Sequence, residues 1–455
     1  MTDRIGGVPA ARIAALAAHE AARYAQAGPR TQAALAAGGQ RYLGGVPMHW
    51  MRDWPQPFPM LVDRAKGAVI HDIDGHRIDD FCLGDTGSMF GHSPAPVARA
   101  IRAQAGRGLT YMLPTEAALQ AGALLSDCFG PMRWQIATTA TDANRFALRV
   151  ARAVTGRRKV LVFNGCYHGT VDDTMVRLGP AGTEARPGLV GQVADLTQTA
   201  VVAEFNDLAS VEAALAAGDV AAILTEPVMT NSCMVLPGQG FHAGLRDLAT
   251  RHGALLIIDE THTISSGFGG YTRVHGLQPD MFVVGKCVAG GVPTAVWGMT
   301  EDVAQRFAAY DATRPAGHSG MGTTLSANPM QFACLVATLS QVMTAENYAR
   351  MEAGAARLCA GLSKQIARFA APWNVVRVGA RVEFICAPGP LHNGTQAEAA
   401  HHPALEAAIH QALLNRGCLI APFHNMMLIS PATSTRQIDR LIAAFADVLG
   451  HLFET

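Results

Sequence analysis

The sequence predicts an α/β protein in which a large domain with a mostly parallel sheet flanked by helices is joined to a smaller α+β domain. Seven short apolar runs alternate with helical segments in the middle of the chain, a pattern typical of strands covered on both faces. Later residues are mostly helical, with two extended apolar stretches, and 455 residues are too many for one simple core. We expect an N-terminal arm with a small β segment at 1–93, the large domain at 94–330 and the small domain at 331–455.

The N-terminal region begins with an Ala-rich stretch, residues 10–37, whose apolar spacing predicts helix. Residues 44–60, "GGVPMHWMRDWPQPFPM", contain too many prolines for a regular element. An apolar irregular segment of this kind packs on a partner, lines a pocket or covers the core. Alternating residues on either side of Asp74-Gly75 predict a β-hairpin.

The large domain contains the seven candidate strands. Their sequences are "WQIATT" (134–139), "KVLVFNG" (159–165), "TAVVAEF" (199–205), "VAAILTEP" (220–227), "ALLIIDE" (254–260), "MFVVGK" (281–286) and "AVWGMT" (295–300). Helices are expected between many of them, at 143–155, 208–217 and 240–252. Because ligands of such sheets bind at the carboxyl ends of the strands, this domain is the candidate for catalysis.

The C-terminal region predicts three helices and two extended stretches. A long helical stretch runs from Asn328-Pro329 to about residue 369 and is followed by extended chain at 375–388. Next come a helix at 405–416, extended chain at 418–430 and a last helix at 435–452. Strands among helices indicate a smaller α+β domain.

Composition excludes several classes of partner. Lys+Arg (36) balances Asp+Glu (36), so there is no electrostatic footprint for nucleic acid or an anionic membrane. The nine cysteines are scattered without a CxxC pair or Cys/His cluster, which favours free thiols and argues against a metal site. No continuous apolar segment begins the chain, so we expect no signal peptide, no membrane span and a cytoplasmic protein.

Three predicted strands end on ionisable residues: Glu226, Asp259 and Lys286. A buried ammonium is costly unless it is paired, neutralised or used chemically. A lysine desolvated at the mouth of a parallel sheet can become the neutral amine that Schiff-base formation needs. An aspartate at a nearby strand end can keep a pyridine nitrogen protonated. The spacing of Asp259 and Lys286 is compatible with one strand-to-strand excursion, although an acid and a lysine taken alone also fit a surface salt bridge.

The residues around this pair resemble the signature of the class III aminotransferases, pyridoxal-phosphate enzymes of fold type I. The Asp-Glu of "ALLIIDE", the Pro-Asp and Gly-Lys of "PDMFVVGK" and the following Gly-Gly match in order and spacing. The resemblance implies that residues 94–330 bind pyridoxal 5′-phosphate (PLP), that Lys286 forms the internal aldimine and moves protons, and that Asp259 contacts the pyridine nitrogen.

Further cofactor contacts are implied by the same resemblance. "GCYHGT" is similar to a segment in which an aromatic residue stacks on the cofactor ring, here Tyr167, followed by His168. "TTATDAN" resembles the phosphate loop, with Thr139, Ala140 and Thr141 as candidates at a helix N-terminus, which attracts anions.

A threonine from the partner subunit is also implied. "GTTLSANP" resembles a segment whose threonine reaches the partner's phosphate, which places Thr324 in that position and Thr323 as the second possibility. The active enzyme is therefore expected to be a homodimer.

The sequence departs from the family pattern at several positions. Ala140 and Asp142 replace the usual glycine and glutamate, and Thr323 replaces the glycine before the phosphate threonine. Thr261 stands where a valine normally packs on the cofactor, His262 follows it, and the arginine often found soon afterwards is missing. Within the family the chain is most similar to the glutamate-1-semialdehyde aminomutase branch and its β-amino-acid transaminase relatives.

Other candidates have a structural alternative. Glu226 either contacts the surroundings of the cofactor or caps the pocket floor, and His168 is either catalytic or, as we favour, structural. Substrate carboxylates usually need an arginine. Arg52, beside Trp50 in the Trp-rich segment, and Arg381 are the candidates for substrate contact.

The resemblance implies an aminotransferase that moves an amino group from an amine or amino acid donor to a keto acid or aldehyde acceptor. Two alternatives stay open. One is a PLP-dependent isomerase, either an aminomutase that returns the amine to its own substrate or a racemase, and the other is a non-catalytic PLP-binding protein.

Overall fold

The computed structural model describes residues 4–421 and 424–454, which pack into two compact units. Unit 1 contains Met1–Pro94, Ala349–Pro390 and Ala400–Thr455, and unit 2 contains Ala95–Tyr348 and Leu391–Ala399. The first expected segment and most of the last thus fall within unit 1, whereas residues 331–348 and 391–399 belong to unit 2. The three-part domain division stays a proposal.

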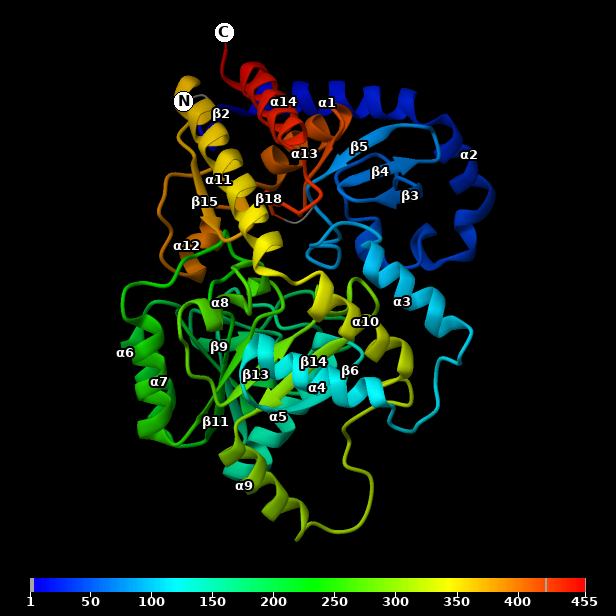
Figure 1. The fold of residues 1–455 in the computed structure, drawn as a ribbon. Helices are drawn as coiled ribbons and strands as arrows, with labels where there is room; N and C mark the ends of the chain where they lie inside the picture. Colours follow the sequence, from blue (N-terminus) through cyan, green and yellow to red (C-terminus); the bar gives the residue numbers. More distant parts are fainter. Residues whose placement is uncertain (1–3, 422–423, 455) are drawn as a thin grey trace. The chain divides into compact units, whose positions relative to one another are not determined.

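Unit 2 is built on a seven-stranded sheet (Figure 1) with the order β10-β7-β11-β12-β13-β14-β6. The strands are β6 (Arg133–Ala137), β7 (Lys159–Phe163), β10 (Ala200–Ala203), β11 (Val220–Thr225), β12 (Leu255–Asp259), β13 (Met281–Val284) and β14 (Ala295–Met299). The pairs from β10 to β13 are parallel, and β14 is antiparallel to both β13 and β6. All seven predicted strands are confirmed, and so is the mostly parallel sheet.

Helices cover both faces of this sheet, as strands without a polar face require. One face packs on α5 (Ala140–Thr155), which shares a core with Ile257, Met281 and Val283. The other face carries the alternate residues: Phe282 contacts Phe129 of α4 (Glu116–Phe129). Because successive strand residues point to opposite faces of the sheet, residues two apart in a strand contact helices on the same face.

The remaining elements of unit 2 surround this sheet. They are α3 (Ala95–Ala105), α6 (Leu208–Leu215), α7 (Phe241–His252), α8 (Gly270–Val274), α9 (Glu301–Asp311), α10 (Pro329–Gln341), α12 (Gly394–Ala399), the hairpin β8 (Val176–Gly179) and β9 (Gly182–Ala185), and the 3-10 turns η4 (Asp172–Thr174), η5 (Leu196–Gln198), η6 (Thr263–Ser265) and η7 (Lys286–Ala289).

Unit 1 contains three small sheets. They are β1 (Arg4–Ile5) with β2 (Val8–Pro9); β17 (Cys418–Leu419), β5 (Arg77–Asp80), β4 (Val69–Asp72) and β3 (Val62–Lys66) in that order; and β15 (Asn374–Val378), β16 (Arg381–Ile385) and β18 (Met426–Leu428). The antiparallel β4–β5 pair confirms the hairpin predicted at Asp74-Gly75. The predicted stretch 375–388 forms two strands, because Gly379, with φ 52, turns the chain between β15 and β16.

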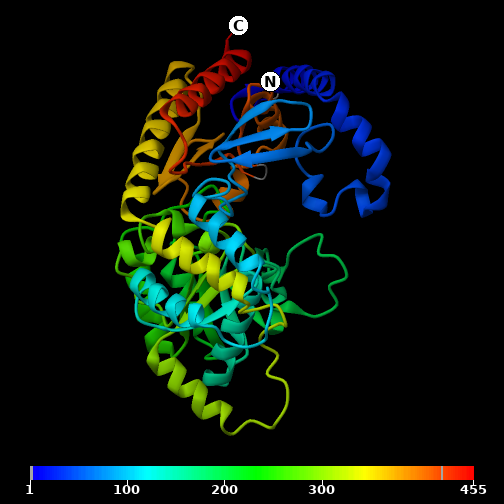
Figure 2. The same ribbon diagram turned by 45° about the vertical axis from the view of Figure 1, so that its right-hand side comes forward.

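The helices that the structure describes in unit 1 are α1 (Ala10–Ala27), α2 (Pro29–Gly38), α11 (Ala345–Arg368), α13 (Pro403–Asn415) and α14 (Thr435–Phe453), with the 3-10 turns η1 (Gly39–Arg41), η2 (Leu43–Gly45) and η3 (His49–Met51) before the hairpin. Side chains of α1, α11, α13 and α14 contribute to an apolar core. Figure 2 shows α11 and α14 side by side. They approach so closely that a Cβ on Gly361 would lie 2.2 Å from Ile442.

The long C-terminal helix predicted up to residue 369 is interrupted, and this part of the prediction is wrong. α10 ends at Gln341 and α11 begins at Ala345. The hydroxyl of Thr344 accepts a hydrogen bond from the backbone N of Asn347 at 3.3 Å, a cap that starts a new helix. Among residues 4–421 and 424–454, no helix is both long and apolar enough to cross a membrane.

The core of unit 1 predicts a difference between two valine substitutions. Val448 of α14 is fully buried, whereas Val274 of α8 is 54% exposed. Val448→Ala should lower the free energy of unfolding by about 2 kcal/mol, because two buried methyl groups are lost and a cavity is left. Val274→Ala, the matched helical control, should leave the urea midpoint unchanged. Equal midpoints for the two variants would contradict the packing described.

Candidate active site

Asp259 and Lys286 lie at the carboxyl ends of neighbouring parallel strands. β12 pairs with β13, and Asp259 stands opposite Val283 in the register. The backbone N of Glu260 bonds to the carbonyl of Val283 at 2.7 Å, which extends the pairing past the strand end. Lys286 follows three residues later, at the first position of η7. The two predicted residues therefore reach the same edge of the sheet.

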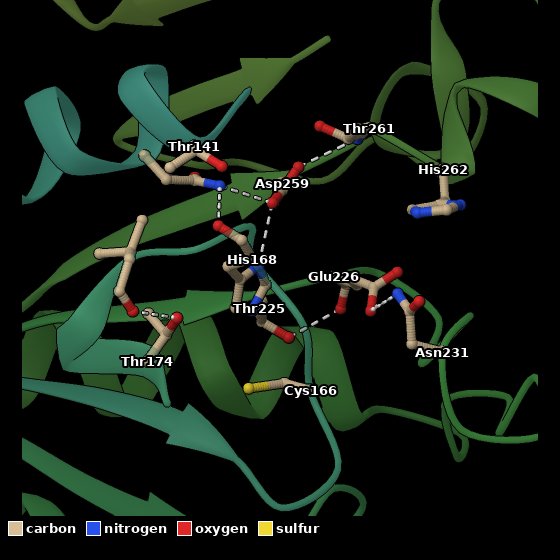
Figure 3. A network of polar contacts seen from close by, with 12 residues as sticks. Thr141, Cys166, His168, Thr174, Thr225, Glu226, Asn231, Asp259, Thr261 and His262 are labelled. Atoms are coloured by element: carbon tan, nitrogen blue, oxygen red, sulfur yellow. Dashed lines mark hydrogen bonds and ion pairs between the residues drawn. The ribbon is translucent and has the colours of Figure 1, made fainter. Parts of the chain in front are cut away.

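The carboxylate of Asp259 is held by donors from three segments (Figure 3). Asp259 is two residues after Ile257, so its side chain points to the same face of the sheet, towards α5. There Asn144 Nδ2 donates a hydrogen bond to Asp259 Oδ2 at 2.8 Å. His168 Nδ1 lies 2.9 Å from the same oxygen, and the backbone N of Thr261 donates to Oδ1 at 3.0 Å. A buried carboxylate needs such compensation. With three donors, it retains acceptor capacity for a further one.

The Asp259–His168 contact is a buried ion pair. Burial alone would raise the pKa of Asp259, but the hydrogen bond and charge of His168, with the bonds from Thr261 and Asn144, hold it below its usual value. Burial would likewise lower the pKa of His168, but Asp259 and the neighbouring Cys166 raise it to about 10. His168 is thus an imidazolium cation that stabilises the Asp259 carboxylate.

Glu226 is buried just after β11, in the same view (Figure 3). Burial raises its pKa to about 7, although His168 and bonds from Thr230 and Asn231 oppose the shift. Thr230 Oγ1 donates to Oε2, and Asn231 Nδ2 lies 3.4 Å from Oε1. Glu226 can therefore gain or lose a proton near neutral pH, and its contact with the cofactor's surroundings stays a prediction.

Lys286 is held in an uncommon backbone conformation. Its φ is 51°, a left-handed value that costs a non-glycine residue about 1–3 kcal/mol and persists only where the surroundings fix it. Gly285 permits close packing on the start of α5, since a Cβ there would lie 2.9 Å from the Cβ of Ala140. The lysine side chain is half-buried, and its Nζ lies 2.8 Å from Nε2 of His262.

The residues predicted to bind the phosphate lie at the N-terminus of α5. Thr139 is the N-cap, and its hydroxyl accepts a hydrogen bond from the backbone N of Asp142 at 3.1 Å. The hydroxyl of Thr141 accepts from the backbone N of Thr170 at 3.1 Å. Gly169, with φ 78, fits closely, because a Cβ would lie 2.1 Å from Thr141 Oγ1. The first amides of α5 have no intrahelical acceptor and can bind an anion.

The remaining predicted cofactor residues of unit 2 differ in exposure. Tyr167 is 41% exposed, whereas Thr261 is buried and its Oγ1 has no hydrogen-bond partner. Thr323 and Thr324 are exposed. Ser326 Oγ lies 2.8 Å from Thr323 Oγ1 and 3.2 Å from Thr138 Oγ1, so this segment lies against the residues that lead into the phosphate loop.

The three predicted substrate residues belong to unit 1. Trp50 and Arg52 are exposed in the Trp-rich segment. Arg381 is fully buried at the start of β16, where its guanidinium donates to the hydroxyl of Thr86. Their contact with substrate stays a prediction.

These groups match the parts of one cofactor. An amine at a strand end can bond to an aldehyde, a buried carboxylate with spare acceptor capacity can face a protonated ring nitrogen, and a helix N-terminus can hold a phosphate. The unpartnered hydroxyl of Thr261, two residues from Asp259, offers one more polar contact. The fold and site therefore fit an enzyme that binds PLP.

Comparison with known proteins gives the family. Residues 50–449 match the model of the family Aminotransferase class-III, and the chain belongs to it. A solved glutamate-1-semialdehyde-aminomutase from Pseudomonas aeruginosa PAO1 is 47% identical, with a TM-score of 0.96, over 98% of this chain and 100% of that one. A lysine-to-alanine variant of such a protein from the same organism, equally similar, is in complex with PMP.

Two further similarities bear on the branch within the family. A glutamate-1-semialdehyde 2,1-aminomutase from Roseiflexus castenholzii is 35% identical over 397 residues, 86% of this chain and 90% of the relative. A β-phenylalanine aminotransferase from Variovorax paradoxus is 27% identical, with a TM-score of 0.84, over 96% of this chain and 97% of that one. The expected family, fold and cofactor are confirmed, and the cofactor is PLP.

Sequence reasoning missed two supporting features of the site, Asn144 and the contact of His262 with Lys286. Asn144 could have been found, because it is a polar residue on the face of α5 that also buries Ala147, Leu148 and Ala151. His262 was noted only as the neighbour of Thr261. Its contact with Lys286 depends on the path of the chain after β12, and no local sequence pattern predicts that path.

The buried Asp259–His168 pair predicts a pH-dependent contribution to stability. The pKa of His168 rises from 6.5 to about 10 on folding, so its stabilisation is complete below pH 6.5 and is lost as the pH rises towards 10. The pKa of Asp259 is lowered, so its share is present above its usual value of 3.8 and is lost as the pH falls through the folded pKa.

The melting temperature of wild-type protein should therefore exceed that of His168→Gln by a margin that shrinks between pH 6.5 and 10. Thermal denaturation across this range measures the margin. His451→Gln, an exposed substitution in α14, serves as the control and should show no such trend. A margin that widens with rising pH would count against the ion pair.

Proposed function

We propose that this chain uses PLP to move an amino group between two carbons of one small amino compound, as an aminomutase of the glutamate-1-semialdehyde type. The observation that carries the proposal is the pairing of Asp259 and Lys286 at adjacent strand ends in a chain 47% identical to a solved aminomutase over 98% of its length. The curated relatives at 31–35% identity bear the same name.

PLP supplies an electron sink that stabilises negative charge on the substrate carbon next to the amino group. Lys286 is the residue we assign to covalent attachment of the cofactor. Its Nζ would also accept a proton from the substrate carbon next to the amino group and donate a proton back in a later step. Asp259 Oδ1, whose bond from Thr261 leaves room for another donor, would hold a proton on the ring nitrogen.

Other residues of the chain would bind and orient the cofactor. The first amides of α5, with Thr139, Ala140 and Thr141, would hold the phosphate. Tyr167 would stack on the ring, while His168 acts as a structural partner of Asp259. Glu226, held by Thr230, would line the floor of the site.

A subunit contact belongs to the same proposal. Thr324, with Thr323 as the second possibility, would reach the phosphate of a second copy of the chain. The exposed position of both threonines beside Ser326 supports a homodimer of this kind. Trp50, Arg52 and Arg381 remain the candidates for substrate contact, and we place the enzyme in the cytoplasm.

Aminotransferase activity is the second candidate, in which a keto acid or aldehyde accepts the amino group. The similarity to the β-phenylalanine aminotransferase supports it.

Replacement of Lys286 tests the cofactor assignment. Lys286→Ala should abolish the visible absorption band of lysine-bound PLP, because no other amine is placed at this strand end. Lys364→Ala, an exposed substitution on α11, is the matched control and should keep the band. An unchanged spectrum in the Lys286 variant would refute the assignment.

A single-substrate incubation separates the two reactions. Holo-protein mixed with glutamate-1-semialdehyde and no keto acid should yield the rearranged amino acid, with no net release of a carbonyl product. Chromatography with mass detection measures both. Accumulation of aminated cofactor and a carbonyl product from amino acids, β-amino acids or amines would instead favour the aminotransferase.

A further inference from the structure

His262 lies beside the active lysine, and the proposed function does not account for it. It follows Thr261 in the turn after β12 and is only 5% exposed. Its Nε2 lies 2.8 Å from Nζ of Lys286, within hydrogen-bonding distance. Its side chain therefore contacts the one atom on which lysine chemistry depends.

The backbone of His262 is fixed on its C-terminal side. Both the backbone N and the hydroxyl of Ser265 bond to the carbonyl of His262, at 3.3 and 3.0 Å. Thr263 Oγ1 donates to the buried carboxylate of Glu260 at 2.6 Å. The same carboxylate accepts a hydrogen bond from the backbone N of Tyr271 at 3.1 Å, so Glu260 links η6 to α8. His262 is thus part of an anchored turn.

Lys286 is fixed as firmly, by its left-handed φ and by the packing of Gly285 on Ala140. The contact of 2.8 Å thus joins two side chains whose backbones are both held. Such rigid support is what a functional contact needs if it is to keep its geometry.

Electrostatics limits how this pair can be protonated. At hydrogen-bonding distance one nitrogen must accept, so the pair holds at most one excess proton: the ammonium donates to a neutral imidazole, an imidazolium donates to a neutral amine, or both groups are neutral. Two adjacent cations would repel each other. Other titratable groups at these strand ends are Glu226, Asp259, Glu260 and His168, of which Asp259 and His168 neutralise each other. Burial raises the pKa of Glu260.

We propose that His262 is a positioning residue that orients Nζ of Lys286 and takes up its excess proton. The proton leaves the ammonium and binds Nε2, so total charge is unchanged and the lysine becomes the neutral amine that attacks an aldehyde. This inference rests on the proposed function, because it assumes that Lys286 bonds to PLP.

Reconstitution of cofactor-free protein tests the proposal without measuring turnover. PLP is added to wild-type, His262→Leu and His262→Gln proteins across a range of pH, and the visible band of lysine-bound PLP is followed. His262→Leu should form the band at least about a hundredfold more slowly, the lower end of the usual effect of a positioned proton acceptor. Its rate should also rise only at higher pH. His262→Gln, which retains an acceptor, should recover part of the rate.

Pyridoxamine 5′-phosphate is the control ligand, because it lacks the aldehyde and cannot bond to Lys286. Its affinity for His262→Leu should equal that for wild type. If that affinity is lost, His262→Asn, which is polar but too short to reach Nζ, takes its place and should show the same slow reconstitution.

Two failures are distinguishable. Wild-type protein that forms no band contradicts the proposed function itself. If wild-type protein forms the band and the leucine or asparagine variant forms it at the same rate and with the same pH dependence, only the role of His262 is overturned.

Discussion

A carboxylate buried at the end of β12 constrains the whole site. Asp259 is 3% exposed, and an isolated charge there would be far too costly to keep. Its donors come from α5, from the loop after β7 and from its own turn. Because Asn144 also donates to the carbonyl of His168 at 3.2 Å, the helix and the loop are fixed to each other as well as to the strand.

This arrangement links the parts of the cofactor site mechanically. Thr141 at the start of α5 accepts a bond from the segment that carries Tyr167 and His168, and Gly169 leaves no space between them. Gly285 packs on Ala140 from the other side, and this contact fixes the position of the backbone next to Lys286. The amine, the carboxylate and the phosphate loop are therefore organised by the chain itself. Preorganisation of this kind lowers the cost of binding a cofactor.

Much of this architecture could be predicted from local sequence. Continuous apolar runs such as "LLIID" and "MFVV" predicted buried parallel strands, and their polar ends predicted where Asp259 and Lys286 would meet. The break before α11 was missed because it depends on one cap, the hydroxyl of Thr344. The pairing of a C-terminal strand with an N-terminal strand in unit 1 could not be predicted, for a different reason. β17 pairs with β5, more than three hundred residues earlier, and such pairings leave no local signal.

We propose that Lys286, and no other lysine, carries PLP. The chain has only four lysines, Lys66, Lys159, Lys286 and Lys364, so the attachment point can be identified without ambiguity. Reduction of the holo-protein with borohydride makes the bond to the lysine permanent, and mass spectrometry of the digested chain then locates the pyridoxyl group. We predict that it is found on the peptide that contains Lys286. A pyridoxyl group on another lysine, or on none, would contradict the account.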